Sequence, residues 1–187
     1  VVRSYFVKRV AIVGPESAGK TTLAHHLSER FSTVHADEYA RHLLNEYVEH
    51  RGYAPGRVDS DDIATIARGQ IAIEDALAEQ ANRLVITDTE LLTTVYWSRY
   101  YFGTCPAWVE HEASRRSYDL YLILSPEMPW VADPQRPMPD IEERRTFFAW
   151  WKHELAARGR RFVIIDALTW ADRAAQAETV INQLLSG

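Results

Sequence analysis

The order of hydrophobic and polar positions predicts short buried strands that alternate with amphipathic helices. Valine, isoleucine and leucine gather in five short runs, and the stretches between them carry apolar residues at helical spacing. The predicted strands are Lys8 to Val13, about Thr33 to His35, Leu84 to Thr87, Leu120 to Leu124 and Phe162 to Ile165. Continuous apolar runs of this kind are typical of a mostly parallel sheet that helices cover on both faces.

Seven helices are predicted in the remaining sequence: Lys20 to Phe31, Asp37 to about Tyr47, Ser60 to about Ala81, Glu90 to Phe102, Ala107 to about Arg116, Ile141 to Arg158 and Ala171 to Leu185. The segment Ser125 to Asp140 contains five prolines, each of which lacks a backbone donor, so a loop is expected there. The predicted fold class is therefore α/β, a three-layer sandwich around a five-stranded, mostly parallel sheet.

Length and charge narrow the class of protein. The chain has 187 residues, 47% of them hydrophobic, which fits one domain spanning residues 1–187. A net charge of −5 argues against nucleic-acid binding, which requires a basic face.

No apolar run approaches the roughly 20 residues of a membrane span, and no signal peptide is recognised. With Cys105 as the only cysteine, no internal disulfide can form, and a cytoplasmic location is expected. The oligomeric state is not predicted.

A phosphate-binding motif lies at the end of the first predicted strand. Residues 14–21 read GPESAGKT and match G-x-x-x-x-G-K-[ST], with a helix following directly. In such a P-loop, successive backbone N–H groups surround the phosphates of a nucleotide, Lys20 reaches the β- and γ-phosphates, and the Thr21 hydroxyl binds Mg²⁺. We expect ATP contacts from Gly14, Glu16, Ser17, Ala18, Gly19, Lys20, Thr21 and Thr22. The motif makes the fold class specifically that of a P-loop NTPase.

Carboxylates follow two of the predicted strands, where ligands of parallel sheets bind. Asp88 comes directly after Leu84 to Thr87, at the position of a Mg²⁺-binding Walker-B carboxylate. Asp37 and Glu38 follow the second strand and are candidates for orienting or deprotonating an acceptor hydroxyl. Both sites have a structural alternative, because Asp37 and Asp88 are also suited to cap the helices that follow them.

The proline-rich segment is a candidate lid, about residues 125–145. Phosphoryl transfer spreads negative charge over the transferred oxygens, and an arginine on a closing loop stabilises that charge. Arg136 lies within the loop and is the preferred candidate for this role. Arg144 and Arg145 lie on the next predicted helix beside two glutamates, where an ordinary solvated face is an equally good interpretation.

Aromatic and histidine residues give weaker signals. A cluster of rings follows Asp88, and core packing is favoured over substrate stacking for each of Tyr96, Trp97, Tyr100, Tyr101 and Phe102. Trp130 in the proline-rich loop is a better candidate for ligand contact. The seven histidines show no metal-ligand spacing, since His25 and His26 are adjacent and face different sides of a helix, so no chemistry is assigned to them.

Four sequence blocks together resemble the ribosylnicotinamide kinase domain of the NadR type: GPESAGKTTL, DEYAR (Asp37 to Arg41), TDTELLTT (Thr87 to Thr94) with the later YFG, and PWVADPQR (Pro129 to Arg136). The resemblance spans nearly the whole chain. It implies a P-loop kinase that uses ATP to phosphorylate the ribose 5′-hydroxyl of nicotinamide riboside, giving nicotinamide mononucleotide. It further implies that Lys20 and Thr21 serve ATP and Mg²⁺, that Glu38 and Asp88 serve the metal or the acceptor hydroxyl, and that Arg136 serves the lid.

Two positions depart from that family pattern. The family carries an aromatic residue directly before its Glu-Tyr pair, where this chain has Asp37, and a second aromatic near 69–76, where this chain has none. The alternatives are a kinase for another nucleoside or nucleotide, or a non-catalytic nucleotide-binding regulator. A guanine-nucleotide switch is excluded because its N-K-x-D and D-x-x-G motifs do not occur. The choice between ATP and GTP, and between the carboxylates as base, stays open.

Overall fold

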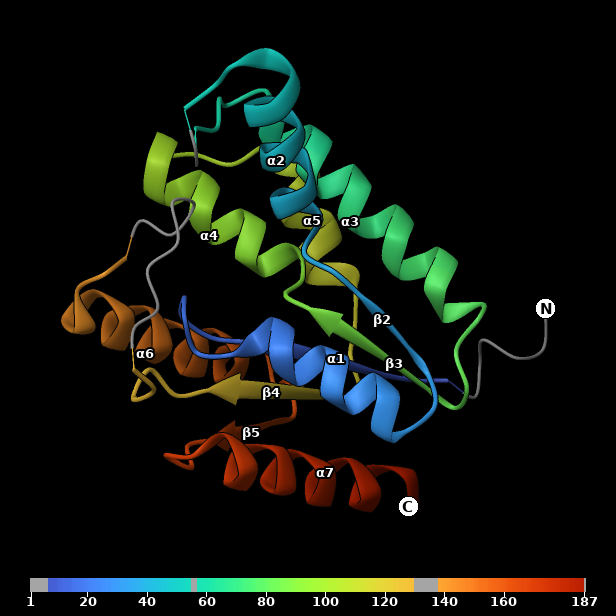
Figure 1. The fold of residues 1–187 in the computed structure, drawn as a ribbon. Coiled ribbons are helices and arrows are strands. Elements are labelled where there is room, and N and C mark those ends of the chain that lie inside the picture. The colour runs from blue at the N-terminus through green and yellow to red at the C-terminus, as the bar shows by residue number, and fades with distance from the viewer. Residues whose placement is uncertain (1–6, 55–56, 130–137, 187) are drawn as a thin grey trace.

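Five parallel strands form the centre of the fold in the computed structural model, which describes residues 7–54, 57–129 and 138–186 (Figure 1). The strands are β1 (Lys8–Val13), β2 (Val34–Ala36), β3 (Leu84–Asp88), β4 (Leu120–Leu124) and β5 (Phe162–Ile165). Their order across the sheet is β2-β3-β1-β4-β5, and every neighbouring pair is parallel. The predicted strands are confirmed, and the sheet is fully rather than mostly parallel.

The described residues also contain the predicted helices: α1 (Lys20–Arg30), α2 (Tyr39–Arg51), α3 (Asp62–Ala78), α4 (Leu91–Phe102), α5 (Ala107–Arg115), α6 (Ile141–Ala157) and α7 (Trp170–Ser186). The prediction that α3 extends to about Ala81 was wrong, because the Gln80 backbone N–H turns back to the carbonyl of Leu77 and ends the helix. Within these ranges, no helix is long and apolar enough to cross a membrane.

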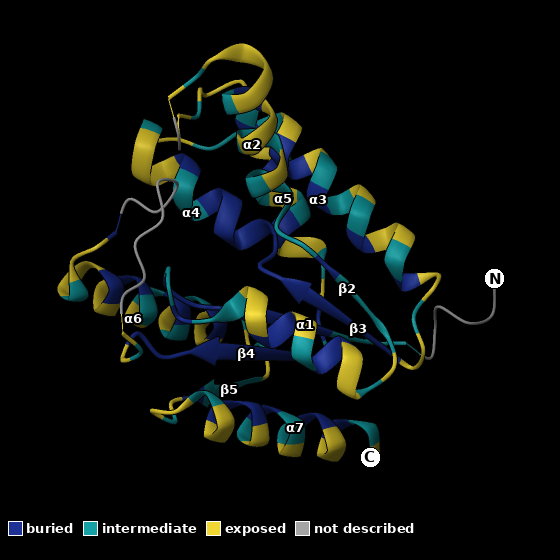
Figure 2. Ribbon diagram, viewed as in Figure 1, coloured by how far each residue is buried: buried dark blue, intermediate teal, exposed yellow. Residues whose placement is uncertain are grey.

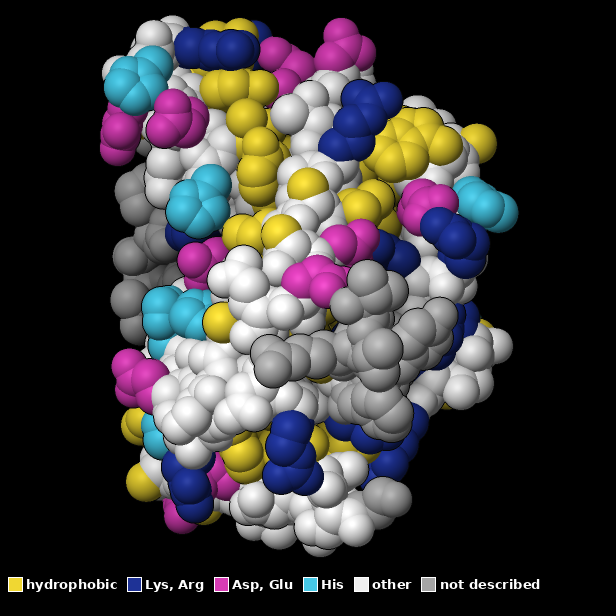
Figure 3. Space-filling model, turned by 90° about the vertical axis from the view of Figure 1, so that its right-hand side faces the viewer, with side chains coloured by type: hydrophobic (Ala, Val, Ile, Leu, Met, Phe, Trp, Pro, Cys, Tyr) yellow, Lys and Arg dark blue, Asp and Glu magenta, His cyan; other side chains and the backbone are white. Residues whose placement is uncertain are grey.

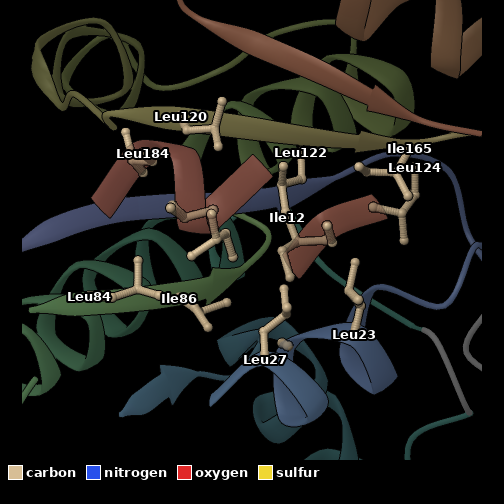
Figure 4. Close-up of a cluster of buried hydrophobic side chains, with 14 of the residues drawn as sticks. Ile12, Leu23, Leu27, Leu84, Ile86, Leu120, Leu122, Leu124, Ile165 and Leu184 are labelled. Carbon is tan, nitrogen blue, oxygen red and sulfur yellow. The ribbon is translucent and has the colours of Figure 1, made fainter. Parts of the chain in front are cut away.

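One face of the sheet is covered by α1 and α7. Side chains on alternate strand positions point to this face, including Ile12 and Ile86, and meet Leu23 and Leu27 of α1 (Figure 4). All four are fully buried. Truncating one such leucine to alanine costs about 2–5 kcal/mol, so this layer contributes a large share of the stability of the fold.

The opposite face is covered by α3, α4, α5 and α6. The remaining strand positions, such as Ala11 and Ile123, pack against Leu91, Phe147 and Trp151 from these helices. The central strands are consequently buried from both sides, and the exposed residues lie on the outer sides of the helices and in the loops (Figure 2). This arrangement explains why the strand sequences are continuous apolar runs rather than alternating ones.

The parallel sheet brings its carboxyl-terminal ends to one edge. The loop after β1 lies between Asp88 at the end of β3 and Ser125 after β4, because β1 pairs with both strands. Ile12 of β1 is in register with Asp88. A ligand beyond this edge would meet the phosphate loop, a buried carboxylate and the first residues of the segment after β4 together.

Candidate active site

The backbone of residues 14–19 adopts a conformation that its glycines make possible. Gly14 has a φ of +133°, and a Cβ atom there would lie 2.6 Å from the carbonyl oxygen of Leu124. Gly19, with a φ of +88°, precedes the first turn of α1 and has no side chain to cap it. Ser17 also has a positive φ, at 57°. The loop is therefore held in an irregular, strained path of the kind that turns consecutive N–H groups toward a bound anion.

Arg173 of α7 holds the phosphate loop in place through hydrogen bonds on its buried side. Its guanidinium is fully buried and donates to the carbonyl of Ala18 (2.9 Å), the carbonyl of Ala167 (2.7 Å) and the Oγ of Ser125 (2.8 Å). Burial lowers the pKa of Arg173 below its ordinary value. The sequence offered no signal for this role, since Arg173 lies far from the motif along the chain and its acceptors are mainly backbone carbonyls.

Lys20 begins α1 and lies in the pocket beyond the loop. Its Nζ donates to the carbonyl of Pro15 at 3.0 Å, so the ammonium group crosses the mouth of the loop. This contact holds the cation where the phosphates of a nucleotide would bind, and the predicted position of Lys20 is consistent with phosphate binding.

Thr21 and Asp88 form a compact oxygen site beside Lys20. The Thr21 Oγ1 donates to the Oδ2 of Asp88 at 2.5 Å, while the Oδ1 of Asp88 is buried without a hydrogen-bond partner in the described residues. Burial and the nearby charge of Glu38 raise the pKa of Asp88 to about 6, although Lys20 and Thr21 oppose that shift. A hard cation would satisfy the unpartnered oxygen and offset the buried charge. The hydroxyl and carboxylate oxygens therefore fit Mg²⁺.

The two carboxylates after β2 lie in different environments. Glu38 lines the pocket at the start of α2. Asp37 is not among the lining residues, and its carboxylate faces His25, His35 and His42. Neither forms a side-chain cap for α2, so the capping interpretation of Asp37 was wrong: the chain enters the helix one residue later, at Glu38.

A cap is present at α4, and it is formed by Glu90 rather than Asp88. The fully buried Glu90 carboxylate accepts a hydrogen bond from the backbone N–H of Leu92 at 3.0 Å. Burial raises the pKa of Glu90 to about 8. Asp88 therefore does not cap α4, and its carboxylate accepts a hydrogen bond from Thr21 instead.

The start of α2 is positioned by α3. The side-chain oxygen of Gln70 accepts from the backbone N–H of Tyr39 at 3.0 Å, and the Gln70 amide donates to Glu74. A Cβ at Gly69 would lie 2.1 Å from the ring of Tyr39, so only glycine leaves room for that ring. Because Glu38 directly precedes Tyr39, these contacts fix the backbone that carries it. Residues 69–76, where the family pattern has an aromatic residue, contain none in this chain, and the ring of Tyr39 from α2 packs there against Gly69.

The pocket extends from the phosphate loop into an apolar cleft between α2, α3 and α4. Its polar end is lined by loop residues and Lys20, and its other walls include Leu44, Val58, Ile63, Ile66, Trp97, Tyr101 and Phe147. Among the rings near Asp88, Tyr96 packs on Phe147 with centroids 4.0 Å apart, as expected for core packing. Trp97 and Tyr101 stack on one another and still line the pocket. These two rings are available to a flat ligand.

The described residues include only the two ends of the candidate lid. Arg136 and Trp130 lie outside the described residues. Arg145 pairs with Glu127 and Glu142 on an exposed face, which confirms the solvated interpretation for that residue. For Arg144 the same interpretation was wrong: the side chain is buried and donates to the carbonyl of Pro126 at 3.1 Å. Its helix face turns inward because α6 packs on the sheet.

The sequence of this chain is similar to two curated bacterial proteins. The chain is 29% identical over 185 residues to the trifunctional NAD biosynthesis/regulator protein NadR of Escherichia coli (strain K12), covering 98% of this chain and 44% of NadR. It is 33% identical over 147 residues to the protein of the same name from Salmonella typhimurium (strain LT2), covering 78% and 35%. The chain therefore spans less than half the length of these curated relatives.

Solved structures give the same result. A crystal structure of NadR in complex with NR matches with a TM-score of 0.77 at 25% identity, over 99% of this chain and 51% of that chain. Thymidylate kinase from Ehrlichia chaffeensis matches with a TM-score of 0.65 at 17% identity, over 94% and 98%, which shows a shared fold alone. The expected resemblance to the NadR type and the P-loop fold are confirmed. Since the AAA domain family matches residues 9–173, this chain belongs to that family.

Proposed function

We propose that this chain is an ATP-dependent kinase that phosphorylates the ribose 5′-hydroxyl of nicotinamide riboside to give nicotinamide mononucleotide. The observation that carries the proposal is one continuous pocket that joins the phosphate loop at Lys20 to an apolar cleft containing Trp97 and Tyr101. Similar NadR proteins have been solved with NR and with NAD and AMP-PNP, which supports both halves of this pocket. The reaction would belong to NAD biosynthesis.

On the donor side, the loop N–H groups and Lys20 would bind the phosphates of ATP. Thr21 and Asp88 carry the oxygens that would hold Mg²⁺, which would neutralise phosphate charge when bound. The role of these residues is to bind and orient, because phosphoryl transfer depends mainly on positioning and electrostatic stabilisation. Glu16 and Thr22 also line this end of the pocket.

On the acceptor side, Glu38 lines the pocket and Asp37 does not, so we assign the acceptor hydroxyl to Glu38. The 5′-oxygen would form a bond to the γ-phosphorus as the bond to the β,γ-bridging oxygen breaks, and the hydroxyl proton would pass to Glu38. ADP is then the leaving group. The cleft with Trp97 and Tyr101 would hold the flat nicotinamide ring during the transfer.

On the lid, Arg136 is the arginine proposed to approach the transferred phosphoryl group. Support comes from the fixed ends of the segment. The backbone N–H of Met138 donates to Glu16 of the phosphate loop at 3.1 Å, and Arg144 holds the carbonyl of Pro126. The contact of Met138 puts the described C-terminal end of the candidate lid beside the phosphate loop, which supports a role for Arg136 where developing negative charge would need a cation.

The direct test is an ADP-release screen with nicotinamide riboside and the common nucleosides as acceptors, and with ATP and GTP as donors. The highest kcat/KM is expected with nicotinamide riboside, with the product confirmed as the mononucleotide by mass spectrometry. Lys20→Ala is the control, and it should abolish turnover while leaving the circular-dichroism spectrum unchanged. A preference for another nucleoside would overturn the substrate assignment. Nucleotide binding without turnover of any acceptor would instead indicate a regulator.

A further inference from the structure

Asp37 is surrounded by imidazoles from three elements. Its Oδ1 lies 3.3 Å from the Nε2 of His35 and 3.9 Å from the Nε2 of His25, and its Oδ2 lies 3.7 Å from the Nε2 of His42. His25 belongs to α1, His35 to β2 and His42 to α2. In Figure 3, histidine and acidic side chains gather along one edge of the face in view. The carboxylate is therefore the centre of a histidine cluster that no sequence spacing revealed.

The hydrogen bonds of His35 direct a lone pair toward this centre. The hydroxyl of buried Ser28 donates its single proton to the carbonyl of His25 at 2.8 Å. The same Oγ lies 2.9 Å from the Nδ1 of His35 and has no second proton to give, so this arrangement favours the tautomer in which Nδ1 donates to Ser28. The Nε2 of neutral His35 then faces the Asp37 carboxylate with a lone pair. Two acceptors at 3.3 Å repel each other unless a proton or a metal ion lies between them, so this pair is suited to share a cation.

We propose that His25, His35 and Asp37 form a binding site for a zinc-type transition-metal ion, with His42 as a fourth ligand. One nitrogen or oxygen atom from each of the first three lies within 4.8 Å of the others. Ligands of one tetrahedral Zn²⁺ lie roughly 3.3 Å apart, as bond lengths near 2.0–2.1 Å require. Closing the site needs movements on the order of 1 Å. The side chain of His25 is 56% exposed, so solvent rather than packed protein lies on one side of it and leaves room for such a movement.

The ligand chemistry separates this site from the one at Thr21 and Asp88. Imidazole nitrogen is a ligand for Zn²⁺, Ni²⁺ and Cu²⁺, whereas Mg²⁺ requires an oxygen shell. The bond from His35 Nδ1 to Ser28 is of the kind that orients metal-binding histidines. A bound ion would link α1, β2 and the start of α2, directly beside Glu38. The site is independent of the proposed function, because its test requires neither ATP nor an acceptor.

The test is a titration of the untagged, metal-free chain with ZnCl₂ by isothermal calorimetry. Co²⁺ serves as a second probe, because tetrahedral Co²⁺ absorbs visible light strongly. One Zn²⁺ per chain is expected, with Mg²⁺ in millimolar excess leaving the affinity unchanged. His25→Ala and His35→Ala should each weaken binding at least tenfold, and His42→Ala should weaken it less. His111→Ala and His153→Ala, which remove histidines of α5 and α6, are the matched controls and should bind as the wild type does.

A thermal melt with and without Zn²⁺ gives a second readout. At a hundredfold excess over the wild-type Kd, Zn²⁺ should raise the Tm of the wild type by about 5 °C or more, and it should raise the Tm of His25→Ala by no more than about half as much. His25 is exposed, so this variant tests the site even if His35→Ala fails to fold. Absence of stoichiometric binding, or equal affinity in the His25 variant and the His111 control, would overturn the proposal. Neither outcome bears on the kinase assignment.

Discussion

The Thr21 hydroxyl donates a hydrogen bond of 2.5 Å to the Asp88 carboxylate, which joins the first turn of α1 to the end of β3. The two residues are far apart in the sequence, and the contact joins the exposed Thr21 to a fully buried carboxylate. Since Asp88 is fully buried with a raised pKa near 6, its charge is costly until a cation or a proton compensates for it. This relationship makes Asp88 the most informative position for mutation.

Asp88→Asn removes the charge that would face Mg²⁺ and keeps the size of the side chain. We expect the variant to lose at least tenfold in Mg²⁺-dependent turnover, while ATP affinity measured without metal changes less than threefold. Turnover is followed as a function of Mg²⁺ concentration, and metal-free binding by calorimetry. Equal losses in both measurements would indicate that Asp88 has a purely structural role.

Gly14→Ala tests the close contact between the start of the phosphate loop and the end of β4 at Leu124. The new Cβ would lie 2.6 Å from the carbonyl oxygen of Leu124, so we expect the free energy of unfolding to fall by about 3 kcal/mol or more. Gly103→Ala is the control, because its φ is also positive, at +71°, but no atom lies within 4 Å. The control should lose only about 1–2 kcal/mol. The free energy of unfolding of both variants is measured by urea denaturation. Equal losses in the two variants would contradict the close contact between Gly14 and Leu124.

Arg173→Lys shortens the anchor behind the phosphate loop and cannot supply the forked donors that reach both Ala18 and Ser125. We expect a loss of stability on the order of 3 kcal/mol, because several buried acceptors lose their partner. The amide hydrogens of residues 14–19 should also exchange faster. Arg30→Lys, at an exposed pair with Glu178, is the control and should change neither measurement. If amide exchange of residues 14–19 is unchanged in the Arg173 variant, Arg173 does not hold the phosphate loop in place.

Glu90→Gln changes how stability depends on pH. Burial raises the pKa of Glu90 from 4.5 to about 8, so the folded chain binds this proton more tightly than the unfolded chain does. The stabilisation is fully present below pH 4.5 and is lost as the pH rises through about 8, by up to about 1.4 kcal/mol per pH unit. Glutamine keeps the acceptor for Leu92 without titrating. The variant should therefore lose less stability than the wild type between pH 5 and pH 8, measured by urea denaturation; parallel curves would disprove the shift.

Arg136→Ala tests whether the lid supplies a catalytic cation. If Arg136 contacts the phosphoryl group mainly in the transition state, kcat should fall more than tenfold while ATP affinity changes little. Arg136→Lys should not rescue turnover fully, because an ammonium cannot form two parallel bonds to phosphate oxygens. Arg145→Ala, on an exposed face, is the control and should keep near-normal kcat.

Arg144→Ala needs a separate readout, because this arginine is buried against Pro126. Its removal is expected to lower stability, so its turnover is compared only at temperatures where the variant is folded. Near-normal kcat in Arg136→Ala together with a collapse in folded Arg144→Ala would place the catalytic cation on α6 instead of the loop.

The local pattern of the sequence determined the strands, the helices and the phosphate loop. Each depends on short-range physics: strand runs on continuous burial, helices on 3.6-residue periodicity, and residues 14–21 on backbone angles that glycine allows. Because parallel strands end at one edge, the sequence also located Lys20, Thr21, Glu38 and Asp88 near one another. The end of α3 was misjudged by a few residues, since helix ends depend on single hydrogen bonds.

Only the tertiary structure decided which distant groups meet. Arg173 reaches the phosphate loop from α7, Arg144 turns inward to the carbonyl of Pro126, and His25 and His35 converge on Asp37 from separate elements. None of these contacts has a fixed spacing along the chain, because the packing of helices on the sheet sets the distances. Asp37 shows the difference most clearly. The sequence grouped it with Glu38 as one catalytic pair, but adjacent residues after a strand point to different sides, and the structure gave them different neighbours.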